Sequence, residues 1–282
     1  MQKLELFDET FDPDRTESYE LSIQVSLNGF SFCIKDLTRD FFIGLGSCPF
    51  NSSAVSSDDW IQQVSFIANT YKWMGNSFKR VLFCYVSPSF CLAPKHFFNP
   101  EQAKNLLSAS HQIDDLDEVR FNERHESMVS VYNVPSTLIT SWLRVQSKSR
   151  IIGYCDPPLN FHLINFLDER APVLTISFNS KFAVITISKD QKILHCGSID
   201  TLNVDDTLYH MVNICNTLGV ETSKTKVVTM GYHSKSNMVL AMIERFFGEV
   251  STVSKNQQNH FSYLLNNYQS KFASLFNQTL CE

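Results

Sequence analysis

The sequence predicts an α/β protein made of two copies of one folding unit, each with the element order β-β-β-α-β-α-β-α. Two observations lead to this class. A β-hairpin pattern occurs twice, at residues 21–34 and 173–188, and each is followed by an amphipathic helix and then by a continuous apolar strand. The 282 residues are 43% hydrophobic and only 19% charged, which is the composition of a folded chain with a large core.

Three strands open each half. In the first half, the dipeptide Asn28-Gly29 separates two segments rich in apolar residues, and such dipeptides are typical of tight hairpin turns. In the second half, Asn179-Ser180-Lys181 occupies the corresponding place. The expected strands are 21–27, 30–34 and 41–43 in the first half, and 173–178, 182–188 and 191–196 in the second.

An amphipathic helix follows these strands in each half. The first helix is expected to begin after Ser56 and the second after Asn203, because both residues are favoured as N-caps. Each first turn carries a pair of aspartates, which suits the positive end of the helix dipole. The offset that relates Asp58 to Asp205 also aligns the apolar positions of the two helices, so the halves correspond in register as well as in order.

Each half is then expected to continue with a buried strand, a helix, a short strand and a final helix. Continuous apolar runs suit a central strand that is covered on both faces. The expected elements are 80–86, 136–145, 150–154 and 158–167 in the first half, and 226–232, 237–247, 249–253 and 258–276 in the second.

Residues 87–133 have no counterpart in the second half. They are expected to hold a helix from about Asn99 and a hairpin within 119–132, and so to form a small subdomain inserted into the first unit. The domain boundaries that follow are 17–170 for the first unit and 171–282 for the second.

Three antiparallel strands followed by αβαβα form the ribonuclease H-like topology, and two such units facing each other across a cleft resemble the actin-like ATPase superfamily. The segments Tyr19-Glu-Leu-Ser-Ile-Gln-Val-Ser-Leu-Asn-Gly-Phe-Ser-Phe-Cys-Ile34 and Val131-Tyr-Asn-Val-Pro135 are similar to an uncharacterised bacterial family of unknown function with this fold. The resemblance covers roughly residues 17–270 and implies a fold but no established activity. The inserted unit resembles the extra subdomain of pilus-assembly and division members.

The resemblance also indicates where a nucleotide would bind. Active members of the superfamily hold phosphates between two hairpin turns, each next to an aspartate that acts through Mg²⁺ and water. Here Gln24 and Thr175 stand at those two positions, so Mg²⁺ cannot be held in the usual way. Other cleft positions are small or polar and are candidates for ligand binding, although hairpin turns use the same residue types. They are Ser26, Asn28, Gly29, Ser177, Asn179 and, in the adenosine loop, Gly231.

The leading functional hypothesis is therefore a non-catalytic actin-like scaffold or binding protein that could serve as an assembly module, with no catalytic or metal-binding residues. No cofactor is expected under this hypothesis. Two alternatives remain open. One is an ATP-dependent kinase or ATPase that uses ATP and Mg²⁺ with atypical cleft residues, and the other is a sensor that binds a small molecule in the interdomain cleft.

Charge and cysteine usage bear on partners and location. A net charge of −5 and a pI near 5.9 argue against a nucleic-acid-binding surface. No apolar run approaches the roughly 20 residues that span a bilayer, so no transmembrane segment is expected. The eight cysteines include no Cys-x-x-Cys pair and favour reduced thiols in the cytoplasm. The start of the inserted segment, residues 90–98, is rich in apolar side chains, so residues 87–133 are expected either to dock on the first domain or to bind a protein partner or a second copy.

Overall fold

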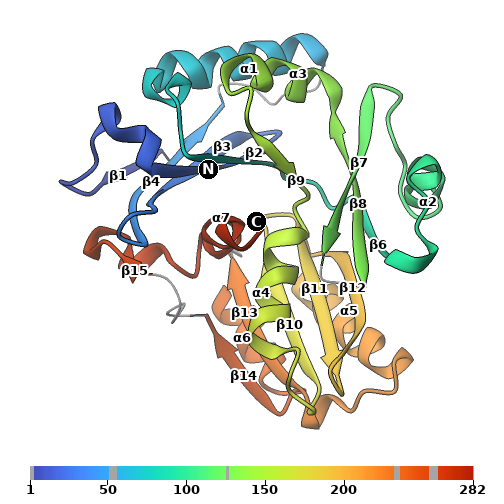
Figure 1. Cartoon of the computed structure of the whole chain (residues 1–282). Coiled ribbons are helices and arrows are strands. Elements are labelled where there is room, and N and C mark those ends of the chain that lie inside the picture. The colour runs from blue at the N-terminus through green and yellow to red at the C-terminus, as the bar shows by residue number, and fades with distance from the viewer. Residues whose placement is uncertain (1–2, 51–55, 125–126, 232–235, 254–259, 282) are drawn as a thin grey trace.

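The computed structural model describes residues 3–50, 56–124, 127–231, 236–253 and 260–281. Two mixed β-sheets lie at its centre, each covered by helices on its outer face (Figure 1). Within the described residues, no helix is long and apolar enough to cross a membrane.

The first sheet has the strand order β1-β4-β3-β2-β5-β9. Strands β2, β3 and β4 form an antiparallel meander, and β5 and β9 continue parallel to β2. Helices α1 and α3 pack together over its outer face. The bounds are β1 (Leu4–Phe7), β2 (Tyr19–Ser26), β3 (Gly29–Asp36), β4 (Phe41–Pro49), α1 (Ser57–Thr70), β5 (Arg80–Tyr85), α3 (Ser136–Val145), β9 (Arg150–Ile152) and α4 (Asp156–Phe166).

The second sheet has the order β12-β11-β10-β13-β14, with the same strand directions as β4-β3-β2-β5-β9. This correspondence confirms the predicted duplication of a ribonuclease H-like unit. Leu174 and Ile176 face a core shared with α5 and α6. The bounds are β10 (Val173–Phe178), β11 (Phe182–Lys189), β12 (Lys192–Asp200), α5 (Val204–Thr217), β13 (Lys226–Gly231), α6 (Ser236–Ile243), β14 (Glu249–Thr252), β15 (His260–Phe261) and α7 (Ala273–Phe276).

Local chemistry explains where the paired helices begin. Ser56 and Asp59 form a reciprocal capping box at the start of α1, and the Asn203 side chain accepts a hydrogen bond from the Asp205 backbone at the start of α5. Strand β4 runs beyond the predicted 41–43. Its Gly46 lies under the Phe32 ring, which a Cβ there would approach to 2.2 Å. Glycine therefore allows close packing inside a strand that the sequence pattern did not reveal.

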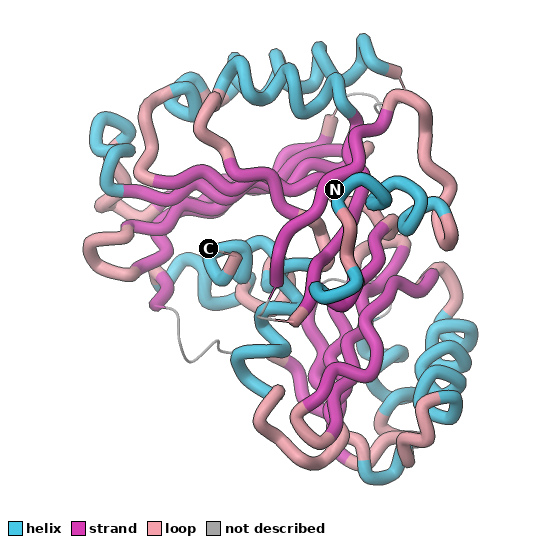
Figure 2. The backbone as a smooth tube through the Cα atoms, turned by 45° about the vertical axis from the view of Figure 1, so that its right-hand side comes forward, coloured by secondary structure: helices cyan, strands magenta, loops and turns pink. Residues whose placement is uncertain are grey.

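The final helix of each half packs on the sheet of the other half. Helix α4 contacts β10 and β11, and α7 contacts β2 and β3 as well as β13. Figure 2 shows the C-terminal segment lying between the two sheets. Side-chain contacts join the halves, because Asn160 on α4 donates a hydrogen bond to the Leu280 carbonyl, and Gln278 donates one to the Ile23 carbonyl.

The predicted helix over 258–276 is wrong. Of that range, 258 and 259 lie outside the described residues, and the rest forms β15, a 3-10 helix at Tyr263–Tyr268 and the short α7. Strand β15 pairs in parallel with β4, and the Phe261 ring stacks on Phe42 with centroids 4.9 Å apart. Aromatic packing against the first sheet therefore overrides the helical pattern of this segment.

The inserted segment forms a three-stranded sheet, β6-β8-β7, covered by α2. The predicted hairpin is present as β7 (Asp117–Arg124) and β8 (Met128–Pro135), and the predicted helix as α2 (Ala103–Ser108) with a preceding 3-10 turn. Strand β6 (Phe90–Pro94) was not expected. It lies beside β12 of the second sheet, where Ser198 Oγ donates a 2.8 Å hydrogen bond to the Pro88 carbonyl.

Candidate functional site

A cavity of about 930 Å³ lies between the two hairpin turns. The β2–β3 turn contributes to one side and the β10–β11 turn to the other. The end of β12 and the segment from Tyr268 to Leu275 contribute further lining residues. The cavity therefore draws residues from both halves of the chain.

Six of the eight candidate cleft residues line this cavity, and Thr175 and Ser177 do not. The six are Gln24, Ser26, Asn28, Gly29, Asn179 and Gly231. The two hairpin turns thus converge on one space, as the topology of a duplicated fold requires.

The side chains of Thr175 and Ser177 point away from the cavity. They lie in the packed interface between β10 and helices α4 and α7. Thr175 is 2% exposed, and its Oγ1 lies 3.0 Å from His162 Nδ1 on α4. Ser177 is 1% exposed and hydrogen-bonds Ser274 at 3.0 Å at α7. Alternation along the strand gives these two residues the same face, and that face is filled.

His162 is a buried neutral link between α4 and the second sheet. Its Nε2 lies 2.7 Å from Ser188 Oγ, and its Nδ1 contacts Thr175. Burial disfavours the charged imidazolium and lowers the pKa of His162 to about 4. The Thr175 hydroxyl is thus hydrogen-bonded to His162 within the packed interface and does not face the cavity.

Gln24 lies at the other position that the resemblance assigns to a carboxylate. Its side chain lines the cavity, and its Nε2 is buried with no hydrogen-bond partner among the described residues. A buried donor without an acceptor is destabilising by roughly 1–3 kcal/mol. If the Gln24 amide turned so that Nε2 faced the cavity, an acceptor atom placed there would remove this cost.

The turn residues mostly stabilise their own hairpins. Ser26 Oγ donates a 3.0 Å hydrogen bond to the Gly29 carbonyl and accepts one from the Asn28 backbone. The Asn179 backbone donates to the Phe182 carbonyl at 2.8 Å, and its side-chain amide donates to the Tyr154 hydroxyl at 3.4 Å. The polar groups of both turns are therefore used mainly within their own hairpins, while the turns themselves line the cavity.

Gly231 is required by the backbone of the second half. Its φ is +86°, and a Cβ there would lie 2.1 Å from the Phe178 carbonyl oxygen. Its N–H donates to the Ser270 carbonyl at 2.8 Å, which ties the end of β13 to the C-terminal segment. The remainder of the predicted adenosine loop, residues 232–234, lies outside the described residues.

Charge on the cavity lining is mainly positive. Lys3, Lys181 and Lys271 line it, whereas Asp200 is the single carboxylate among the lining residues. Sequence reasoning identified Lys181 only as part of a turn and missed Lys271. No local sequence signal could have placed Lys271 here, because its segment reaches the cavity only where the C-terminal helix packs on the sheet of the first half.

The residues present do not fit a magnesium nucleotide bound in the superfamily's usual way, because neither hairpin offers a carboxylate at the expected position. Mg²⁺ is usually bound through one or two carboxylates together with phosphate oxygens of the substrate. Gln24 offers an amide, and Thr175 is buried away from the cavity. In the described part of the chain, no group of three or more His, Cys, Asp or Glu residues could hold a metal ion.

Comparison with known proteins agrees with this architecture. Residues 8–250 match the family described as "Protein of unknown function (DUF3822)". The chain belongs to the DUF3822 family. No curated protein matches it.

Two solved structures are similar to this DUF3822 protein over nearly their full length. The first is a Bacteroides thetaiotaomicron protein with an actin-like ATPase fold and unknown function, at 18% identity and a TM-score of 0.79, with 97% of this chain and 100% of that chain covered. The second is from a PilM-PilN type IV pilus biogenesis complex, at 11% identity and a TM-score of 0.58, with 95% and 98% covered. The DUF3822 protein therefore has an actin-like ATPase fold.

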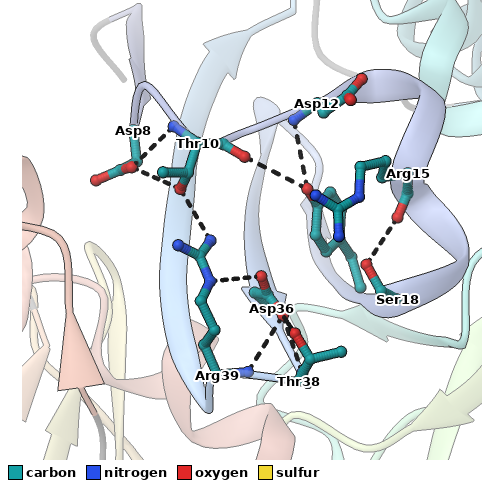
Figure 3. Close-up of polar contacts among 9 residues, drawn as sticks. Asp8, Thr10, Asp12, Arg15, Ser18, Asp36, Thr38 and Arg39 are labelled. Carbon is teal, nitrogen blue, oxygen red and sulfur yellow. Dashed lines mark hydrogen bonds and ion pairs between the residues drawn. The ribbon is translucent and has the colours of Figure 1, made fainter.

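A second, smaller hollow of about 440 Å³ lies between the N-terminal segment and the β3–β4 turn of the DUF3822 protein. Asp36 accepts hydrogen bonds there from Thr38 and Arg39, and Arg39 also donates to Thr10 at 2.8 Å (Figure 3). Partial burial opposes ionisation of Asp36, but these hydrogen bonds and the Arg39 charge lower its pKa overall. These polar groups hydrogen-bond one another, and the hydrogen bonds stabilise the β3–β4 turn.

Proposed function

We propose that this protein is a non-catalytic actin-like binding protein that retains the interdomain cleft of its fold without phosphoryl-transfer chemistry. The supporting observation is the environment of Thr175. This residue stands at a position where the resemblance places a magnesium-directing aspartate, yet it is buried and bonded to His162.

The geometry of the first hairpin supports the same proposal. Phosphoryl transfer depends on positioning and on cancellation of charge by metal ions and cationic groups. Gln24 cannot supply the negative charge that holds a metal ion, and among the described residues Asp200 on β12 is the single carboxylate that lines the cavity. A cavity remains, so binding is retained in this proposal while hydrolysis is lost.

ATP hydrolysis with Mg²⁺ provides the test. We expect the purified protein to release phosphate no faster than its Gln24→Ala variant. Gln62→Ala is the matched control, because Gln62 is exposed on α1 and far from the cavity lining. A magnesium-dependent rate that Gln24→Ala abolishes and Gln62→Ala preserves would refute the proposal and favour a kinase or ATPase.

An assembly role is the second part of this proposal. The inserted subdomain exposes Phe97, which is 87% accessible, and the Phe98 ring beside it packs on Phe121 at 4.9 Å. Exposed aromatic groups of this kind are common at protein contacts. The similar PilM structure was solved as a complex with PilN. We therefore infer that the subdomain contacts a protein partner or a second copy.

We also infer a cytoplasmic location. All eight cysteines are free thiols, and six of them are buried. Burial raises the thiol pKa of Cys33 and Cys84, which keeps both groups unreactive. Free thiols in this number suit a reducing compartment.

A further inference from the structure

The cavity between the hairpins combines positive charge with apolar walls. Lys181 extends from the β10–β11 turn, and Lys3 and Lys271 reach the same space from the two ends of the chain. Lys3 is paired with Glu5 at 3.4 Å, and Lys271 lies 5.5 Å from the Phe272 ring centre. Since Asp200 is the single lining carboxylate in the described part of the chain, the cavity favours a negatively charged occupant.

The walls of the cavity are largely hydrophobic. Both halves contribute, and so does the C-terminal segment. Leu27 at the first hairpin tip is 41% exposed and lines the cavity. The principal apolar lining residues are Leu27, Val86, Phe178, Phe182, Ile199 and Phe272. A small polar anion such as inorganic phosphate would make no apolar contacts with these walls.

One polar side chain of the lining carries a donor that lacks an acceptor among the described residues, and a turn of its amide would bring that donor to the cavity. The Gln24 Nε2 atom is buried and has no partner within the described residues, although it lies beside the turn that carries Ser26 and Asn28. An anionic oxygen accepts hydrogen bonds strongly, and a charge-assisted bond of this type is roughly twice as strong as a neutral one. The donor and the lysine charges therefore select for the same kind of group.

We propose that this cavity binds a metal-free organic anion with an apolar body, such as an aliphatic or aromatic acid. The inference rests on the proposed function, because it assumes a cleft that binds without hydrolysing. The acid group is held near Gln24 and Lys181, and the apolar body lies against the walls built by Phe178, Ile199 and Phe272. No metal ion takes part, which agrees with the absence of paired carboxylates among the lining residues.

The test uses anilinonaphthalene sulfonate as the probe, an aromatic anion whose fluorescence rises when it leaves water. Octanoate serves as the competitor, and both are titrated in the presence of EDTA. We expect one saturable site that octanoate displaces. Lys181→Gln should weaken binding roughly fivefold, as loss of one exposed charge pair of about 1 kcal/mol implies. Gln24→Glu should weaken it more strongly, because it replaces a donor by a negative charge.

Matched variants remove the competing explanations. Lys148→Gln and Gln62→Glu make the same changes at exposed positions outside the cavity lining, and Phe97→Ala removes the exposed ring of the inserted subdomain. All three should bind as the unmodified protein does. Circular dichroism confirms that each variant is folded, and Lys181→Gln alters only an exposed side chain.

The inference is overturned if no saturable site exists, if Lys181→Gln and Gln24→Glu bind normally, or if Phe97→Ala abolishes binding. It is also overturned if Mg²⁺-ATP displaces the probe but ATP in EDTA does not, because the site would then require a metal. Probe binding and phosphate release from ATP are separate measurements. Failure of the anion-site inference can therefore be distinguished from failure of the proposed non-catalytic function.

Discussion

Gly231 is the residue at which a single added carbon should disturb the cavity most. Its backbone is left-handed, and the new Cβ would meet the Phe178 carbonyl at 2.1 Å. We expect Gly231→Ala to lower the free energy of unfolding by about 3 kcal/mol or more. Gly219 is the control, since its φ is +65° but a Cβ there meets nothing within 4 Å. Gly219→Ala should cost only about 1 kcal/mol in urea unfolding, and equal losses would contradict the steric argument.

His162 gives the protein a predictable acid sensitivity. Its pKa is about 4 when folded and near 6.5 in the unfolded chain, so between these values only the unfolded state binds the proton. Stability is therefore complete above pH 6.5 and falls as the pH is lowered toward 4, by about 3 kcal/mol in all. Urea unfolding at pH 7 and pH 4 should show this loss in the unmodified protein.

The control for this pH effect is His162→Gln, which cannot titrate and can still hydrogen-bond Thr175 or Ser188. Its stability should depend less on pH by about the same 3 kcal/mol. Burial lowers the pKa of His195 as well, but that residue is present in both proteins and cancels from the comparison. Parallel pH curves for the two proteins would show that His162 is not buried as a neutral group.

The two hairpin turns of the site could be predicted from the sequence, because turn-forming residues between two apolar segments are a local pattern. Asn28-Gly29 and the turn at Asn179 placed two loops that the fold brings to one cavity. Thr175 shared the same strand pattern, but which face of β10 is filled depends on α4. Packing between segments far apart in sequence decides such burial, and a single sequence carries no direct record of it.

At the scale of elements, β6 joins the inserted subdomain to the body of the protein. Phe90 is 3% exposed in the main core, whereas Phe97, a few residues later, is 87% exposed. We expect Phe90→Ala to cost about 3–5 kcal/mol in the free energy of unfolding. Phe97→Ala should change it by less than about 0.5 kcal/mol.

The same two variants separate docking from association. If Phe97 contacts a second copy, Phe97→Ala should reduce self-association in analytical ultracentrifugation while its Tm stays unchanged. A large loss of stability in Phe97→Ala would mean that this ring is buried against the protein. A deletion of the whole insertion would be less informative, because it also removes Phe90 from the core.

Elements with strong local signals were predictable from the sequence, and elements that depend on a distant partner were not. The capped helices α1 and α5 have both their cap and their period in the sequence. Strand β15 is two residues long and exists because β4 pairs with it, and β6 depends on β8 in the same way. Short strands of this kind follow tertiary contacts rather than intrinsic propensity.

At the scale of the whole molecule, part of the second sheet packs into the core of the first half. Phe182 and Val184 of β11 belong to the same cluster of buried residues as Trp142 and Ile23 of the first half. Hydrogen bonds also join the halves, from Asn160 on α4 to the Leu280 carbonyl and from Gln278 to the Ile23 carbonyl. Such a core opposes the independent movement of two lobes, because separation would expose apolar surface at a cost of roughly 25 cal/mol per Å².

This packing between the halves predicts that a destabilising substitution in one half also lowers the stability of the other. All three tryptophans, Trp60, Trp73 and Trp142, lie in the first half, so their fluorescence reports that half alone. Met211 is fully buried in the core of the second half, and its replacement by Ala should cost about 2–5 kcal/mol. We expect Met211→Ala to lower the midpoint seen by tryptophan fluorescence and by far-ultraviolet circular dichroism equally. Met238→Ala, at a side chain that is 56% exposed, should shift neither. A tryptophan midpoint that stays at its original temperature while the dichroism splits into two steps would show that the halves unfold independently.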